Sequence, residues 1–258
     1  MFKLNGIVIK PTIFSDQTSQ IWKLPDCAFI YGINTIEWTF HNEGEFIQIA
    51  QLKHLLDSKK LESDLWMRYL PYARQDKEVS NETTFALRSF AKLINSLNFK
   101  TVFAIDPHSI IPNFIINNFI PVTCKYEINK VISTIKPELL CYPDKGAKSK
   151  YSEFLTHSYV YADKIRNQLT GEIEGITLNG DVKDKSVLIV DDICDGGGTF
   201  IGLTKELLAA GARKVNLYVT HGIFSKGLTP LTECGISRVF TKDGEMETVQ
   251  GQIVYKEI

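Results

Sequence analysis

Short apolar runs alternate with stretches of helical periodicity along most of the chain. The apolar runs predict strands at residues 64–69, 101–105, 138–142, 158–162, 186–190 and 215–220. Apolar positions at helical spacing predict helices at residues 83–97 and 199–210. This order is typical of an α/β fold with mostly parallel sheets, in which the loops that follow the strands share one edge.

The chain has 258 residues, which is enough for one large domain or two smaller ones. We expect a crossing between two similar halves near residues 121–126. This gives an N-terminal domain over residues 1–125 and a C-terminal domain over residues 126–258. A final strand at residues 252–256 is a candidate to return to the first domain.

The most informative segment is residues 187–200, Val-Leu-Ile-Val-Asp-Asp-Ile-Cys-Asp-Gly-Gly-Gly-Thr-Phe. Its four branched aliphatic residues predict a buried parallel strand. Asp191 and Asp192 stand where we expect that strand to end, and the glycines lead into a helix. Amides of such a turn can hold a phosphate, and paired carboxylates suit sugar hydroxyls or Mg²⁺. The segment therefore predicts a ribose-phosphate site at the carboxyl edge of the sheet. An ordinary polar turn is the alternative, but three consecutive glycines are entropically costly without a close backbone approach.

Two polar segments follow the predicted strands of the first half. In Pro-Tyr-Ala-Arg-Gln-Asp-Lys, residues 71–77, Arg74 suits a phosphate or a base and Gln75 can read a base edge. His108 follows the strand at residues 101–105. Taken alone, the first segment is also compatible with a solvated turn, and a lone histidine is more often structural.

Two cationic segments follow predicted strands of the second half. Residues 142–150 read Tyr-Pro-Asp-Lys-Gly-Ala-Lys-Ser-Lys and predict a loop. Lys164 and Arg166 come at the end of the strand at residues 158–162, before a Gly-containing stretch over residues 167–176 that we expect to hold no strand. Cations in such loops can bind anionic ligands, although solvated surface charges are the alternative.

In this order, the segments resemble those of the phosphoribosyl pyrophosphate (PRPP) synthetase family. The glycine-rich segment alone is shared with type I phosphoribosyltransferases, whereas Pro-Tyr-Ala-Arg-Gln-Asp-Lys resembles the ATP-binding signature of the synthetases. Phe-Ser-Asp-Gln, residues 14–17, is similar to the Phe-Ser-Asn-Gln of the synthetases. In that family, this segment forms a hairpin that reaches the adenine bound by a neighbouring subunit. The resemblance implies two α/β domains of the phosphoribosyltransferase type. Relative to that family, about one strand–helix unit before Phe14 and a final helix are expected to be missing.

The resemblance also implies roles for individual residues. ATP would be bound by Arg74, Gln75, Asp76, His108, Phe14 and Asp16. A pyrophosphate loop would comprise Asp144, Lys145, Gly146, Ala147 and Lys148, with Ala147 in place of a second glycine or with one residue deleted. The catalytic cations would be Lys164 and Arg166. The ribose 5-phosphoryl group would be held by Asp191, Asp192, Asp195, Gly196, Gly197, Gly198 and Thr199. The Mg²⁺ ligands would be His108, Asp144, Asp191 and Asp192.

Composition narrows the class of protein. Hydrophobic residues make up 44% of the chain and the net charge is −1, so there is no broad basic field for nucleic acid or an anionic membrane. No apolar run reaches the length of a membrane span. Five scattered cysteines indicate reduced thiols and a cytoplasmic protein. Neither a Walker A loop nor a GxGxxG fingerprint occurs, so ATP would be bound in another way.

The expected reaction is transfer of the β,γ-diphosphate of Mg-ATP to the 1-hydroxyl of ribose 5-phosphate, which gives PRPP and AMP. The resemblance implies a homo-oligomer, from dimer to hexamer. Three alternatives stay open: the same chemistry on ADP-ribose, which would serve NAD synthesis; a PRPP-consuming phosphoribosyltransferase; and an inactive regulatory homologue. Gly196, Gly197 and Gly198 raise the first of these, because they leave room above the phosphate.

Overall fold

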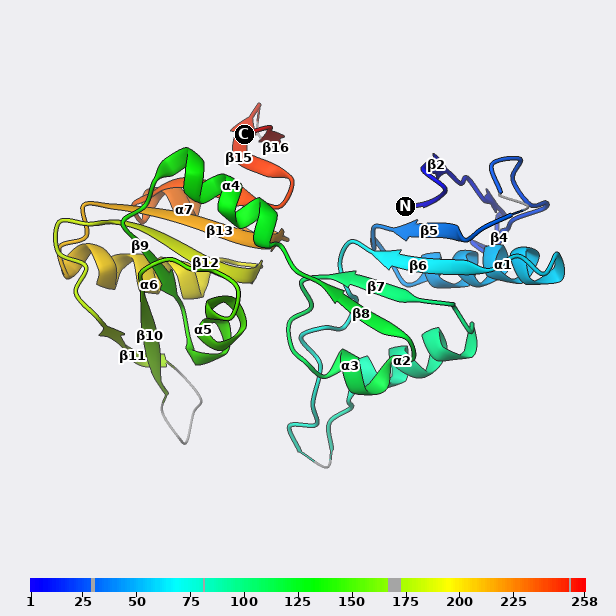
Figure 1. Ribbon diagram of the computed structural model, residues 1–258, viewed down its shortest axis with the longest axis horizontal. Coiled ribbons are helices and arrows are strands. Elements are labelled where there is room, and N and C mark those ends of the chain that lie inside the picture. The colour runs from blue at the N-terminus through cyan, green and yellow to red at the C-terminus, as the bar shows by residue number, and fades with distance from the viewer. Residues whose placement is uncertain (29–30, 81, 167–172, 251) are drawn as a thin grey trace. The chain divides into compact units, whose positions relative to one another are not determined.

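The computed structural model describes residues 1–28, 31–80, 82–166, 173–250 and 252–258. Contacts divide the chain into two compact units, Met1–Thr123 and Cys124–Ile258, each built on its own sheet (Figure 1). The division falls after the strand β8 (Phe119–Val122), two residues before the boundary expected from the sequence.

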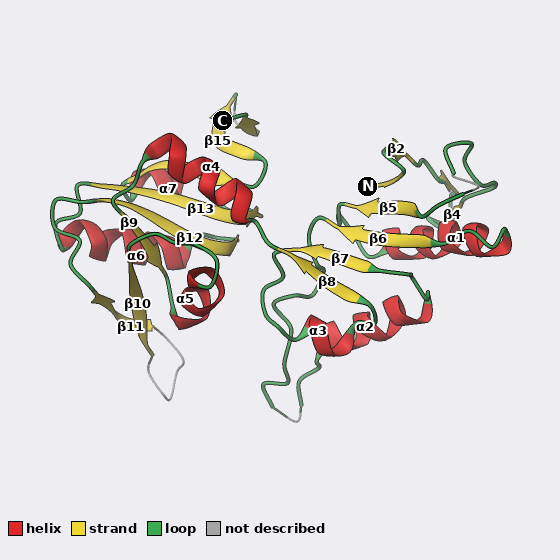
Figure 2. Cartoon of the chain, in the orientation of Figure 1, coloured by secondary structure: helices red, strands yellow, loops and turns green. Residues whose placement is uncertain are grey.

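The sheet of the first unit has the strand order β2-β1-β5-β6-β7-β8. Strands β5 to β8 run parallel, whereas β1 is antiparallel to both β2 and β5. The strands are β1 (Phe2–Leu4), β2 (Ile7–Val8), β5 (Asn34–Trp38), β6 (Ser63–Met67), β7 (Val102–Ile105) and β8 (Phe119–Val122). A separate hairpin consists of β3 (Thr12–Ile13) and β4 (Ser19–Gln20). The helices are α1 (Gly44–Ser58), α2 (Ala86–Ser96) and α3 (Pro112–Ile115), drawn in red in Figure 2.

Alternate residues of this sheet are buried. In β6, Leu65 and Met67 join one core cluster with residues of α1 and α2, while Trp66 is only partly buried. The helix predicted at residues 83–97 begins later, at Ala86. The reason is local, because the hydroxyl of Thr83 accepts hydrogen bonds from two preceding backbone amides and so closes a turn instead.

The sheet of the second unit has the strand order β11-β10-β9-β12-β13-β14-β15-β16. Strands β10, β9, β12, β13 and β14 are parallel, and the remaining pairs are antiparallel. The strands are β9 (Leu139–Tyr142), β10 (Tyr159–Arg166), β11 (Ile173–Asn179), β12 (Ser186–Cys194), β13 (Lys214–Gly222), β14 (Ile236–Thr241), β15 (Gly244–Val249) and β16 (Gln252–Lys256). The helices are α4 (Lys125–Ile135), α5 (Lys145–Ser152), α6 (Gly198–Ala209) and α7 (Thr229–Glu233).

Strand β12 confirms the buried parallel strand but is longer than expected. It runs through Asp191 and Asp192 to Cys194, so the acidic pair lies within the strand and not beyond its end. The cause is unequal pairing on the two sides. Pairing with β9 stops at Ile189, whereas pairing with β13 continues to Cys194 and keeps the backbone extended.

Strands β10 and β11 correct a second expectation. Lys164 and Arg166 lie within β10, which extends four residues past the predicted end. Residues 173–176 belong to β11, which pairs antiparallel with β10, so that part of the stretch expected to hold no strand is a strand. Alternating Ile176 and Leu178 pack against the core and give β11 its buried face. Residues 167–172 of that stretch lie outside the described residues.

The last strand does not return to the first unit. Strand β16 pairs with β15 and extends the second sheet.

All five cysteines are free thiols. Among the described residues, no helix combines the length and apolar character that crossing a bilayer requires.

Candidate functional site

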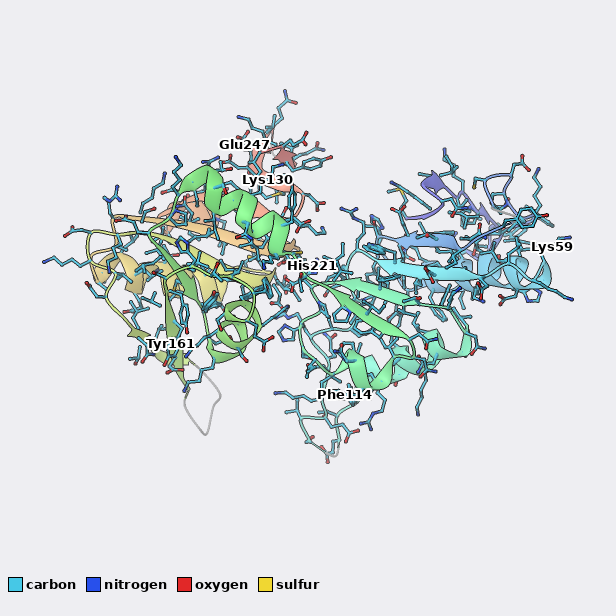
Figure 3. The ribbon with its side chains drawn as sticks, viewed as in Figure 1. Lys59, Phe114, Lys130, Tyr161, His221 and Glu247 are labelled. Atoms are coloured by element: carbon cyan, nitrogen blue, oxygen red, sulfur yellow. The ribbon has the colours of Figure 1, made fainter. Side chains whose placement is uncertain are left out.

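Four parallel strands of the second unit end at the same edge of its sheet. They lie in the order β10-β9-β12-β13, and the first three are followed by or contain residues predicted to bind substrate. Tyr161 on β10 and His221 on β13, both labelled in Figure 3, mark the two outer strands. The carboxyl edge of parallel strands is where open α/β sheets bind ligands.

The glycine-rich turn between β12 and α6 has one glycine that its geometry requires. Gly197 has φ of +79°, and a Cβ there would lie 2.8 Å from Cδ2 of the buried Leu231. A side chain at Gly198 would meet nothing within 4 Å, and one at Gly196 would make only ordinary contact with Lys226. The residues from Asp195 to Thr199 therefore form a turn whose amides lie at the start of α6, with open space above Gly198.

The expected pyrophosphate loop is the start of a helix. Asp144 is the N-cap of α5, and its Oδ1 accepts a hydrogen bond from the backbone N of Ala147 at 2.9 Å. This cap, together with burial of Ala147, folds the segment into a first helical turn instead of an open loop. Lys145 forms an ion pair with Asp163 at 3.2 Å, which ties the helix to β10.

Two further lysines of α5 face neighbouring strands. Nζ of Lys148 lies 4.1 Å from the ring centroid of Tyr161 on β10. Nζ of Lys150 lies 3.8 Å from Oδ2 of the buried Asp192 on β12. Lys150 was not among the site residues predicted from the sequence. Its position in the first two turns of a helix that starts at the same sheet edge was the available signal.

We expect Lys150 to support the acidic pair. Lys150→Met should raise the KM for the ribose phosphate expected from the sequence about fivefold, because Asp192 loses a partly buried cation, and Lys150→Arg should restore it. The matched control is Lys185→Met, since Lys185 also lies 3.8 Å from a carboxylate, that of Asp181, but in an exposed pair. Steady-state kinetics on the three variants test this. Equal KM changes in the Lys150→Met and Lys185→Met variants would contradict the assignment.

The end of β13 is fastened to the end of β12. The carbonyl of Cys194 accepts hydrogen bonds from the backbone N of Ile223 at 2.8 Å and of Phe224 at 3.2 Å. Burial, with smaller effects of Asp191 and Asp195, raises the pKa of the Cys194 thiol to about 12. Cys194 is therefore a neutral thiol in the site, and its role is structural.

The predicted ATP-binding residues of the first unit also lie at a carboxyl edge. Strands β6 and β7 are adjacent and parallel, so the segments of Arg74 and His108 leave the sheet on the same side. Leu87 at the start of α2 donates its backbone N to the carbonyl of Gln75 at 3.1 Å, which fixes the segment. Arg74, Gln75 and His108 are exposed, as ligand-binding side chains must be, and Asp76 is partly buried.

Tyr72 anchors the same segment from an unusual backbone conformation. Its φ is +62°, and its hydroxyl donates a hydrogen bond to Oε1 of Glu43 at 2.5 Å. That bond, with burial and the charge of Glu43, raises the pKa of Tyr72 to about 12. A strained residue held by a charged partner fixes the backbone two residues before Arg74.

The hairpin of Phe14 and Asp16 is packed on α1. Gln51 of α1 accepts from the backbone N of Ile21 at 2.8 Å and donates to the carbonyl of Ser19 at 2.8 Å. Oδ1 of Asp16 accepts from the backbone and the hydroxyl of Thr18, and the hydroxyl bond chiefly lowers the pKa of Asp16. The Phe14 ring packs edge-on against Trp22 and is 39% exposed.

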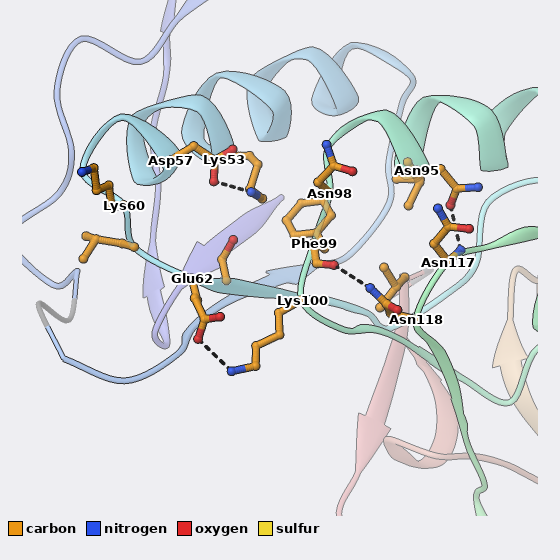
Figure 4. Close-up of a pocket in the computed structure, with 14 residues that line it drawn as sticks. Lys53, Asp57, Lys60, Glu62, Asn95, Asn98, Phe99, Lys100, Asn117 and Asn118 are labelled. Atoms are coloured by element: carbon orange, nitrogen blue, oxygen red, sulfur yellow. Dashed lines mark hydrogen bonds and ion pairs between the residues drawn. The ribbon is translucent and has the colours of Figure 1, made fainter.

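A polar hollow of about 480 Å³ in the first unit lies at the opposite, amino-terminal edge of its sheet (Figure 4). Two of its lysines are already paired with acidic residues of the same wall. Lys53 pairs with Asp57, and Lys100 pairs with Glu62 at 2.7 Å. Since none of the predicted site residues lines it, this hollow is not the candidate substrate site.

The second unit offers suitable donors for the implied Mg²⁺. Asp191 and Asp192 provide adjacent carboxylates at the sheet edge. The described residues contain no group of three or more His, Cys, Asp or Glu that could enclose a metal. Mg²⁺ is usually held by one or two carboxylates together with substrate phosphates, so this donor set fits. Asp144 uses one carboxylate oxygen as a helix cap, and His108 lies in the other unit.

A parallel α/β sheet with a glycine turn after its acidic strand defines a protein of the phosphoribosyltransferase type. The family model of the phosphoribosyl transferase domain matches residues 149–242. The solved structure of a phosphoribosylpyrophosphate synthetase from Mycobacterium smegmatis has a TM-score of 0.74 over 91% of this chain and 80% of that chain, at 19% identity. The predicted fold class of two such domains is confirmed.

The sequence relatives are more specific. The ribose-phosphate pyrophosphokinase of Pyrococcus furiosus is 33% identical over 204 residues, which cover 74% of this chain and 71% of that protein. The enzyme of the same name from Mycoplasmopsis pulmonis is 30% identical, with 69% of this chain and 59% of that protein covered. The chain belongs to the ribose-phosphate pyrophosphokinase family, which confirms the predicted family and its class, a transferase.

Proposed function

We propose that the protein transfers the β,γ-diphosphate of ATP to the 1-hydroxyl of ribose 5-phosphate and releases AMP. The observation that carries the proposal is the joint presence of two segments in one family member. The acidic strand and glycine turn of β12–α6 suit a ribose phosphate, and the Arg74 segment suits a nucleotide. A phosphoribosyltransferase that consumes PRPP needs only the first of these.

Each segment has a distinct part in the proposed reaction. The carboxylates of Asp191 and Asp192 accept hydrogen bonds from the ribose hydroxyls, and the amides from Asp195 to Thr199 bind the 5-phosphoryl group. Lys164 and Arg166 stabilise charge on the diphosphate in transit. Mg²⁺, when bound, neutralises the diphosphate and orients it. The protein contributes mainly position and electrostatics, since phosphoryl transfer needs little covalent help.

ADP-ribose is a second candidate acceptor. The open space above Gly198, where a side chain would meet nothing within 4 Å, favours it. A terminal phosphate does not use this space, whereas a diphosphate that continues into a nucleoside needs it. The product would be ADP-ribose carrying a diphosphate at its 1-position.

The acceptor is tested by measuring kcat/KM for ribose 5-phosphate and for ADP-ribose at equal ATP and Mg²⁺. We expect AMP formation with ribose 5-phosphate and identification of PRPP by mass. A preference of about 100-fold or more for ADP-ribose, about 2.7 kcal/mol in transition-state binding, would replace the first choice with the second.

Two other outcomes would contradict both acceptors. PRPP consumption without AMP formation from ATP would indicate a phosphoribosyltransferase. Substrate binding without turnover would indicate an inactive homologue.

The proposal includes a homo-oligomer in the cytoplasm. In it, the Phe14 hairpin of one copy completes the adenine site of another. Light scattering of the purified protein would test the oligomer.

A further inference from the structure

The side chain of Lys226 lies along the phosphate-binding turn. The position that a Cβ would take at Gly196 is 3.5 Å from Cε of Lys226, 3.6 Å from Cδ and 3.8 Å from Cγ. Three successive carbons of the lysine therefore follow the turn, and the ammonium group is one bond beyond the nearest of them. Lys226 is exposed, and it forms no ion pair with any of the described residues.

The backbone that carries Lys226 is held firmly against β12. The carbonyl of Cys194 accepts from both Ile223 and Phe224, and Gly227 closes the turn by donating its backbone N to the carbonyl of Phe224 at 2.8 Å. The Phe224 ring is buried. Lys226 thus starts from a fixed point beside the turn, so less entropy is lost when its ammonium group pairs with a ligand.

The segment that contains the turn is negatively charged, so a nearby cation would favour the binding of a phosphate. Residues 186–204 include Asp191, Asp192 and Asp195 but no lysine or arginine. A phosphate monoester brings a further charge of about −1.5 to −2 at neutral pH. Backbone amides and a helix N-terminus offset part of this charge, and an ammonium group beside them offsets more.

We propose that Lys226 pairs with the 5-phosphoryl group of the acceptor and thereby selects phosphorylated sugars. This inference rests on the proposed function, because it takes the Gly196–Gly198 turn as the acceptor site. It adds a specificity-determining residue from the segment that follows β13, for which the sequence predicted no ligand. A terminal phosphate carries more charge than either phosphate of a diphosphate bridge, so Lys226 contributes more to ribose 5-phosphate than to ADP-ribose.

Lys226→Met tests the charge while keeping the carbon chain beside Gly196. We expect the KM for ribose 5-phosphate to rise about tenfold, the effect of losing one charge-assisted hydrogen bond. The kcat and the KM for ATP should stay close to wild type, and Lys226→Arg should restore most of the affinity. The KM for ADP-ribose should rise less. Lys214→Met removes a lysine at the opposite end of β13 and should leave every constant unchanged.

Three results would overturn the inference: an unchanged KM for ribose 5-phosphate in Lys226→Met, an equal rise for ATP, or no recovery in Lys226→Arg. Wild-type protein that forms no AMP with either acceptor would contradict the proposed function instead. In that case, calorimetric titration of ribose 5-phosphate into wild type and Lys226→Met decides the role of Lys226. A tenfold loss of affinity supports it, and equal or undetectable binding to the two proteins rejects it.

Discussion

Replacing Lys164 or Arg166 by alanine is expected to lower kcat by about 100- to 1,000-fold, or about 3–4 kcal/mol in transition-state stabilisation. Both residues belong to β10 at the carboxyl edge of the second sheet, next to the strand that leads into α5. The KM values should change much less, because the cations matter most when charge moves between the two substrates. Rapid-quench measurement of AMP formation separates the chemical step from product release.

Lys185, a partly exposed lysine of the same unit, provides the control, and the kcat of Lys185→Ala should match wild type. Circular dichroism establishes that all three variants are folded. If both the Lys164 and the Arg166 variants turn over at near-normal rates, these residues are not the catalytic cations.

The second large effect is expected at Gly197. Gly197→Ala should lower the free energy of unfolding by about 2 kcal/mol, because a side chain is unfavourable at positive φ and would clash with Leu231. It should also raise the KM for the acceptor about tenfold or more, since the amides of the turn would shift. Urea denaturation and steady-state kinetics measure the two effects.

Gly198→Ala is the matched control for this prediction. Its side chain would enter open space at the first residue of α6, so its stability should equal or slightly exceed that of wild type. Gly197→Ala and Gly198→Ala variants of equal stability would show that the turn does not depend on its backbone conformation. The comparison separates the one glycine required by local geometry from a neighbour that leaves space.

The sequence predicted the second sheet better than the first. A strand covered on both faces is a continuous apolar run, and residues 187–190 show this unmistakably. The first sheet alternates buried and partly buried positions, which is a weaker signal, and β5 was not predicted at all. Helix α1 was also missed, although Ile49, Leu52 and Leu56 are buried at helical spacing. Pro121 obscured β8, yet proline is tolerated there because β8 is an edge strand.

Some site residues are positioned by neighbours that are close in the sequence, and others by residues that are far away in the sequence. The β12–α6 turn is local in sequence, so its strand, acidic pair and glycines could be read together. The cap that makes the Asp144 segment a helix is also local, but the segment was predicted to be a loop because it resembles the pyrophosphate loop of the synthetases. The ion pair of Lys150 with Asp192 and the approach of Lys226 to Gly196 join residues about 30 to 40 positions apart. Only the three-dimensional structure shows such contacts.

The carbonyl of Cys194, which accepts two backbone hydrogen bonds, affects how substrate preference could be transferred from one relative to another by exchanging segments. Because it holds the backbone at Ile223 and Phe224, the turn after β12 and the segment after β13 behave as one module. Gly222 belongs to it as well, since a Cβ there would lie 2.0 Å from the Phe224 ring. A chimera that exchanges residues 195–199 alone would place a foreign turn against an unmatched neighbour. Exchange of residues 195–199 together with 222–231 would preserve the contacts by which each segment positions the other.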